Sequence, residues 1–137
     1  MSPRRFIDSN VFVYVLSADP RFSTRALAVL EDAENGAYEA YTSTLVVSQV
    51  LAHLERRRRR KALTAFLGYL EESPIKVVET TMEDYLEARR LAEKAGLEFP
   101  SMWDDLVIAA QMKRLGISEV YSNDRDFDRI PGVRRLF

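Results

Sequence analysis

Two hydrophobic periods alternate along this chain, one typical of buried strands and the other of helices packed on a core. Short apolar runs bounded by turn residues predict strands. Five segments have this pattern: Arg4–Ile7, Tyr38–Thr42, Ile75–Glu79, Val120–Ser122 and Val133–Phe137. Longer segments with apolar residues three or four positions apart predict helices. These are Val11–Leu16, Phe22–Ala33, a stretch from Thr44 that continues or restarts through Arg58–Leu70, Thr81–Ala95 and Ser101–Leu115.

Two of the expected helix starts carry capping signatures. Asp19-Pro20 predicts a start with Asp19 as the N-cap and Pro20 at the first helical position. Ser101 and Asp104 match a capping box, in which each side chain accepts a hydrogen bond from the other residue's backbone amide. Asp104 therefore has a structural role available.

Strands that alternate with helices favour an α/β fold with a mostly parallel sheet of four to five strands. The length of 137 residues fits one domain over positions 1–137. In such sheets, ligands bind beyond the carboxyl ends of the strands. Asp8, Ser43 and the pair Asn123/Asp124 each follow a predicted strand. We therefore expect a site at that edge.

Composition narrows the chemistry and the location. The chain has no Cys and one His, which excludes disulfides, thiolate zinc sites and cysteine nucleophiles. Its net charge is −1, so any binding of nucleic acid requires local patches. No apolar run approaches the ~20 residues that span a bilayer, and the start lacks a secretion-signal cleavage site. We expect a cytoplasmic protein that does not engage the membrane.

Five aspartates stand where strand-to-helix turns and a helix start are predicted: Asp8, Asp104, Asp105, Asp124 and Asp126. Carboxylates gathered from distant segments repel one another unless a cation joins them. Hard oxygen ligands select Mg²⁺ or Mn²⁺. Such a site activates a water and stabilises a phosphoryl oxygen. The pattern therefore predicts a metal-dependent nuclease.

Four of these five aspartates also have a structural explanation. Asp8 is a candidate N-cap for the following helix. Asp124 and Asp126 lie in a turn, where Asp is common for backbone reasons. Asp105 differs, because it begins an apolar stretch in which an unpaired carboxylate is costly. With Asp104 assigned to capping, Asp105 is the better candidate ligand.

Three segments resemble the signature blocks of PIN-domain nucleases: Phe6–Asn10, Asp105–Ala110 and Ser122–Phe127. The likeness is greatest to VapC-type toxins of prokaryotic toxin–antitoxin pairs, and it spans essentially the whole chain. It implies a three-layer α/β/α domain with Mg²⁺- or Mn²⁺-dependent endoribonuclease activity on RNA. A cognate antitoxin and a homodimer are also implied.

The resemblance assigns site residues by position. The implied metal ligands are Asp8, Asp105 and Asp124, with Asp126 as an alternative or an addition to Asp124. Asn10 and Ser122 are implied as supporting polar residues. A phosphotransfer domain of the haloacid-dehalogenase type, with Asp8 as nucleophile, is disfavoured because it needs a second aspartate where this chain has Asn10.

Gln49 departs from the family pattern, which has a glutamate at this position. A neutral amide contributes no charge, so we expect a weaker metal site or the loss of a second ion. This difference leaves an alternative function open. The chain could be a PIN-like module that binds RNA or protein, with weak or lost nuclease activity.

The run Arg56–Lys61 places six cations together. It is either a solvated helix face or a binding surface for phosphate or for an acidic segment of the antitoxin. Acidic residues are sparse within the run, which favours binding.

Overall fold

The computed structural model describes residues 2–137 and contains a five-stranded sheet. Its strands are β1 (Arg4–Ile7), β2 (Glu39–Ser43), β3 (Lys76–Val78), β4 (Glu119–Tyr121) and β5 (Arg134–Leu136). The strand order is β3-β2-β1-β4-β5, and every neighbouring pair is parallel. The predicted α/β fold is confirmed. Because all strands run the same way, their carboxyl ends share one edge of the sheet.

Strand β1 lies at the centre, and its register fixes the relation of its two neighbours. Phe6 lies opposite Tyr41 of β2 and Val120 of β4. Phe6 and Ile7 are fully buried, as expected for a strand covered on both faces. The ladder continues past β1, because the Asp8 amide donates to the Tyr121 carbonyl across 3.0 Å. Asp8 therefore begins its turn directly beside the end of β4.

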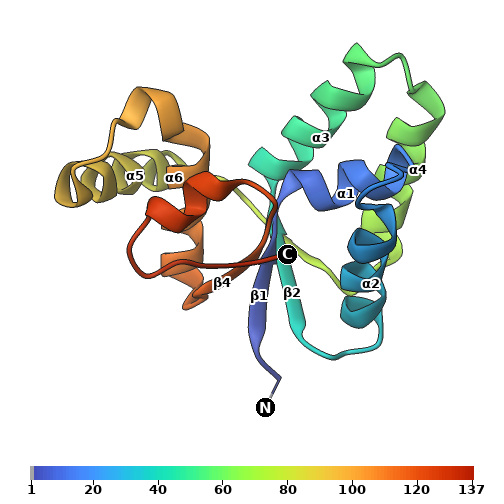
Figure 1. The fold of residues 1–137 in the computed structure, drawn as a ribbon, viewed down its shortest axis with the longest axis horizontal. Coiled ribbons are helices and arrows are strands. Elements are labelled where there is room, and N and C mark those ends of the chain that lie inside the picture. The colour runs from blue at the N-terminus through green and yellow to red at the C-terminus, as the bar shows by residue number, and fades with distance from the viewer. Residues whose placement is uncertain (1) are drawn as a thin grey trace.

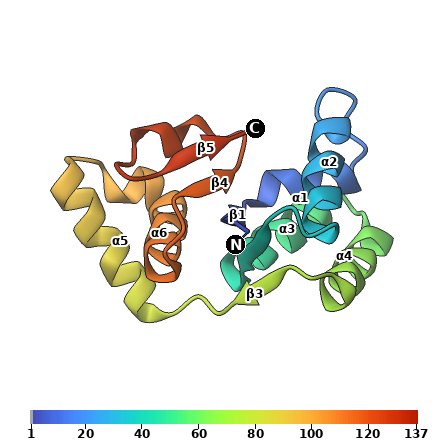
Figure 2. The same cartoon turned by 90° about the horizontal axis from the view of Figure 1, so that it is seen from below.

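Helices cover both faces of the sheet. They are α1 (Ser9–Leu16), α2 (Ser23–Glu34), α3 (Thr44–Arg56), α4 (Arg60–Glu72), α5 (Met82–Ala95) and α6 (Phe99–Leu115). Figure 1 shows α1 to α4 on one side of the strands and α5 and α6 on the other. The view from below in Figure 2 shows the same division. The molecule is the three-layer α/β/α arrangement that the resemblance implies.

Helix α6 is the most deeply buried helix. Every residue from 105 to 112 is buried, so the helix is enclosed almost all round. The apolar stretch of the sequence explains this, since a helix that is hydrophobic on all sides needs neighbours on all sides. Within residues 2–137, none of the helices combines the length and the apolar character needed to cross a membrane.

The predicted start of α2 at Asp19-Pro20 is wrong. One Asp19 carboxylate oxygen accepts hydrogen bonds from the amides of Arg21, at 2.8 Å, and Phe22, at 3.2 Å. This closes a turn that contains Pro20, and the helix begins only at Ser23. The same residues that cap a helix also close short turns, and the sequence does not distinguish the two.

The predicted capping box at Ser101 is also wrong. Helix α6 begins at Phe99, and the Ser101 hydroxyl donates to the Glu98 carbonyl across 3.1 Å. Met102 has φ −133° and ψ 17°, so the helix is kinked at that residue. Asp104 lies after the kink and is free of the capping role.

A capping box does occur at the start of α5. The Thr81 hydroxyl accepts from the Asp84 amide, and the Asp84 carboxylate accepts from the Thr81 amide. The stretch after Thr44 consists of two helices rather than one. Arg58 has φ +56°, a left-handed conformation that ends α3 before α4 restarts at Arg60.

Candidate metal centre

The carboxyl edge of the sheet brings together aspartates from three distant segments. Asp8 follows β1 and is the N-cap of α1. Asp124 follows β4 and is the N-cap of a short 3₁₀ helix, Arg125–Arg129, which contains Asp126. Asp105 enters from α6. The capping role suggested for Asp8 by the sequence is thus present, and it places the carboxylate at this edge.

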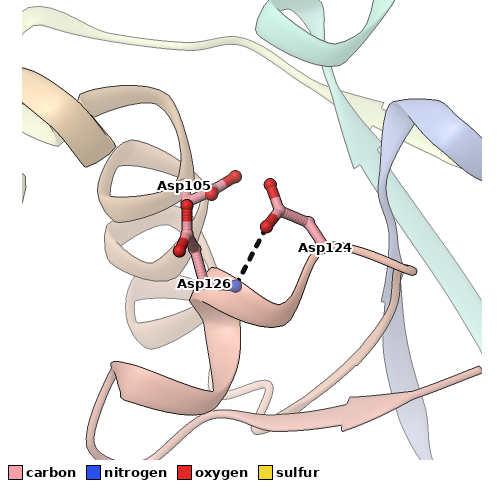
Figure 3. Close-up of side chains that lie close together, drawn as sticks. All are labelled: Asp105, Asp124 and Asp126. Carbon is pink, nitrogen blue, oxygen red and sulfur yellow. Dashed lines mark hydrogen bonds between the residues drawn. The ribbon is translucent and has the colours of Figure 1, made fainter.

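Asp105, Asp124 and Asp126 form a compact acidic group. Each offers one carboxylate oxygen, and these three oxygens lie within 4.8 Å of one another. Figure 3 shows the three side chains converging from α6 and from the turn after β4. The Asp126 amide donates to Asp124 Oδ1 across 2.9 Å, which fixes the turn. The sequence left Asp126 as an alternative or an addition to Asp124, and the structure brings both to the group.

Asp8 lies beside this group and is itself buried. Burial raises the pKa of Asp8 to about 6. Hydrogen bonds from the Ser122 hydroxyl and the Ser9 amide, each 2.7 Å long, oppose that shift. The charges of Asp124 and Asp104 add to it. Asp8 is therefore held by donors on one side and faces other carboxylates on the other.

Asp105 is the least compensated carboxylate of the site. Burial raises its pKa to about 9, and the neighbouring carboxylates of Asp124, Asp8 and Asp104 contribute further. Every charged group that contributes to this shift is a carboxylate. A group of hard oxygen donors with no protein cation fits Mg²⁺ or Mn²⁺. The burial that the sequence predicted for Asp105 is present.

A single hydroxyl organises the polar residues around the aspartates. Ser122 Oγ donates to Asp8 Oδ2 and accepts from the Asp124 amide across 3.0 Å. It also accepts from Asn10 Nδ2 across 3.1 Å. The other end of the Asn10 amide accepts from the Asn123 backbone amide across 3.2 Å. Ser122 and Asn10 thus lock the turn after β1 to the turn after β4.

Gln49, on α3, contacts Asp104 rather than the three-aspartate group. Its Nε2 donates to Asp104 Oδ2 across 3.2 Å, whereas its buried Oε1 has no protein partner among residues 2–137. The other Asp104 oxygen accepts from the Asp105 amide across 3.0 Å.

Asp104 therefore belongs to the surroundings of the site, and its assignment to a capping box was wrong. Its charge contributes to the raised pKa of both Asp8 and Asp105. Sequence reasoning missed this role because the Ser101 match supplied a sufficient local explanation. The available signal was the adjacent pair Asp104–Asp105 together with an amide at position 49.

Comparison with known proteins identifies the family. The family model of the PIN domain matches residues 5–133 of this chain. The chain belongs to the PIN domain family. The predicted resemblance is confirmed, and the matched range includes all the aspartates described above.

VapC proteins are among the relatives of this PIN domain. Ribonuclease VapC13 of Mycobacterium tuberculosis is 27% identical over 135 residues, which cover 95% of this chain and 97% of the relative. The crystal structure of VapC20 from the same organism superposes with a TM-score of 0.75 at 20% identity and covers 95% of this chain and 98% of that one. DNA-bound VapBC of Salmonella typhimurium gives a TM-score of 0.67 at 18% identity and covers 98% and 97%. The two structural matches establish the shared fold.

Proposed function

We propose that this PIN domain is a metal-dependent endoribonuclease and the toxin component of a toxin–antitoxin pair. The observation that carries the proposal is the group of Asp105, Asp124 and Asp126, with Asp8 beside it, at the carboxyl edge of a parallel sheet. The ribonuclease named among the relatives supports RNA as the substrate.

The aspartates have distinct tasks in this proposal. Asp105, Asp124 and Asp126 would hold Mg²⁺ or Mn²⁺, and Asp8 would complete the negative field around it. When bound, such an ion supplies a water nucleophile at neutral pH and positive charge beside the phosphoryl oxygens. Hydrolysis of a phosphodiester then requires that the carboxylates be deprotonated, since only that form binds the cation.

Ser122 and Asn10 act as positioning residues. The Ser122 hydroxyl joins Asp8 to the Asp124 turn through two hydrogen bonds, and Asn10 orients that hydroxyl. Loss of either would leave the carboxylates in place but loosen their relative geometry. Catalysis depends strongly on such geometry.

The alternative of a binding module without cleavage rests on Gln49. In the structure the Gln49 amide points to Asp104, and the three-aspartate group is intact without it. The neutral residue at position 49 therefore leaves the acidic centre complete enough to bind a cation. We favour cleavage over simple binding for this reason.

We also propose an antitoxin partner and a homodimer. Complexes of a toxin with an antitoxin occur among the structural neighbours, including one from Klebsiella pneumoniae with a TM-score of 0.61. An apolar groove of about 310 Å³ between α1, α2 and α4 offers surface for a protein partner, and Leu27 at its edge is 46% exposed.

Cleavage of a purified RNA with Mg²⁺, with Mn²⁺ and with EDTA tests the enzymatic proposal. We expect products in the first two reactions and none in the third. Asp105→Asn should abolish cleavage in all conditions while Arg89→Gln, an exposed change on α5, should not. Cleavage in EDTA, or full activity of Asp105→Asn, would overturn the proposal. Light scattering on the purified chain tests the homodimer separately.

A further inference from the structure

The six cations Arg56–Lys61 run from the last residue of α3 through the turn to the first two residues of α4, and all six are exposed. A continuous helix would distribute consecutive side chains around its axis. Here α3 ends at Arg56, Arg58 has φ +56° and α4 begins at Arg60. We call this segment the basic turn. It gathers like charges at one corner of the molecule.

The charges of the basic turn are not compensated by the protein. Within residues 2–137, none of these six side chains forms an ion pair, although twelve ion pairs occur elsewhere. Burial and then the charges of Arg57, Arg56 and Arg59 lower the pKa of His53, which precedes them on α3. Such a surface attracts a polyanion.

The start of α4 adds to the positive field. Arg59 is the N-cap and makes no side-chain capping bond, and the first turn of α4 contains no acidic residue. Free amide groups and the positive end of the helix dipole therefore face the same corner as the cations. Arg58 and Arg60 also line an open hollow of about 750 Å³, together with one acidic residue, Glu55, and with Leu63 and Thr64. This corner has both the charge and the space for phosphate groups.

Helix α3 connects the basic turn to the metal centre. Gln49 contacts Asp104 near the start of α3, and Arg56 is seven residues further along. That separation is about 10 Å at 1.5 Å per residue. Figure 1 shows α3 rising from the carboxyl edge of the sheet to this turn. An extended strand that enters the metal centre can therefore reach the cations with its next few nucleotides.

We propose that the basic turn binds the backbone phosphates of the RNA substrate outside the scissile bond. The proposal rests on the proposed ribonuclease function and identifies the surface that holds the substrate. RNA is favoured over an acidic protein segment because the cations lie along α3 from the acidic centre, where a nucleic acid must also be held. The net charge of the whole chain is −1, so it does not attract RNA. Local cations are therefore needed to offset the repulsion between the aspartates and RNA.

The test measures binding without cleavage. A fluorescein-labelled 20-nucleotide single-stranded RNA is titrated with the full chain in EDTA, and anisotropy gives Kd at several salt concentrations. The parent is compared with the triple variant Arg57→Gln/Arg58→Gln/Arg60→Gln. If all three contact phosphates, the slope of log K against log salt should fall by about 2, since each phosphate contact on a single strand contributes about 0.7. Affinity near 100 mM salt should fall by an order of magnitude or more.

Two further variants make the result specific. Arg89→Gln/Lys94→Gln/Arg134→Gln also removes three exposed positive charges, on α5 and β5, and should change the slope little. The triple variant Arg57→Lys/Arg58→Lys/Arg60→Lys keeps the positive charge, and its salt slope should equal that of the parent. Thermal melts should show all variants folded, because the replaced side chains are exposed.

The proposal would be overturned if both glutamine variants lost RNA affinity equally, or if the basic-turn variant kept the salt slope of the parent. Unchanged RNA binding together with weaker binding of the cognate antitoxin would also overturn it and would assign the turn to a protein partner. Absence of cleavage with every metal would instead contradict the proposed function, and the salt slope in EDTA would still be measurable.

Discussion

The Gln49 side-chain amide donates a hydrogen bond to the Asp104 carboxylate across 3.2 Å and so joins α3 to α6 beside the three-aspartate group. The donor matters because Asp104 adds negative charge next to Asp8 and Asp105. A glutamate at position 49 would have no proton to donate at neutral pH. The neutral residue thus allows an additional aspartate at the edge of the site.

We predict that Gln49→Glu lowers stability without metal and tightens metal binding. The change removes a hydrogen bond and places two carboxylates within contact distance, so a loss of roughly 1–2 kcal/mol is expected in EDTA. A bound cation should reverse this loss, because the added charge then faces a positive ion. Thermal melts with and without Mn²⁺ and calorimetric titration measure both effects.

The double variant Gln49→Glu/Asp104→Asn provides the control. It returns the number of carboxylates to that of the parent, and the asparagine can donate to the new glutamate. Stability in EDTA should recover most of the loss. A Gln49→Glu protein as stable as the parent, and no tighter for Mn²⁺, would contradict the role assigned to this pair.

Two buried aspartates on the α5–α6 side should respond to the same substitution with opposite signs. Asp84 and Asp105 are 2% and 5% exposed. Burial alone would raise the pKa of Asp84, but bonds from Arg114, the Thr81 amide and Gln111 outweigh it and lower the pKa. The pKa of Asp105 is instead raised to about 9, first by burial and then by neighbouring carboxylates.

We therefore predict that Asp84→Asn destabilises the protein by roughly 1–3 kcal/mol, because it weakens these bonds. Asp105→Asn should stabilise the protein in EDTA, because a carboxyl with a pKa of about 9 must take up a proton on folding at pH 8 and asparagine needs none. Denaturant unfolding at pH 8 measures both. Destabilisation by Asp105→Asn would indicate that this carboxylate has a structural partner after all.

Stability without metal should fall as pH rises. The pKa of Asp8 is about 6 and that of Asp105 is about 9 in the folded chain, against an ordinary value of 3.8. Because both pKa values are raised, the stability that these two carboxyl groups contribute is fully present below pH 3.8. It is lost as pH rises through 6 for Asp8 and then through 9 for Asp105. Melting temperatures in EDTA should therefore decline from pH 5 to pH 9.

Excess Mg²⁺ or Mn²⁺ should reduce this decline, because the cation binds the deprotonated form and its affinity rises with pH. Asp105→Asn should flatten the EDTA profile above pH 6. Melting temperatures that rise from pH 6 to pH 9 in EDTA would contradict the proposed charge balance.

Cleavage should depend on Asp8 and Asp105 in a way that is separable from folding. Asp8→Asn and Asp105→Asn should each abolish metal-dependent cleavage, while melting temperatures in EDTA hold or rise. The gain should be larger for Asp105, because the Ser122 and Ser9 donors already offset part of the cost at Asp8. Asp128→Asn, at an exposed position of the 3₁₀ helix Arg125–Arg129 where the carboxylate pairs with Arg135, should leave cleavage intact and serves as the control.

Local patterns were sufficient for the order and type of the elements. The strand before Asp8 and the apolar stretch after Asp105 carry signals that depend on residues close in sequence, because hydrophobic periodicity is a local property. Strand alternation with helices also indicates a parallel sheet, and hence an edge where turns converge. Asp8, Asp105 and Asp124 were candidate ligands on this basis.

Only the tertiary structure decided which neighbour each side chain meets. Asp19 and Ser101 were both read as helix caps, yet one closes a turn and the other lies inside a helical turn. The kink at Met102 leaves Asp104 available to Gln49, 55 positions earlier in the chain. Capping motifs compete with other uses of the same residues, and a contact such as that between Gln49 and Asp104 depends on how the sheet places the start of α3 beside α6. Sequence determined which carboxylates were present at the edge, and packing determined which are paired and which remain for a cation.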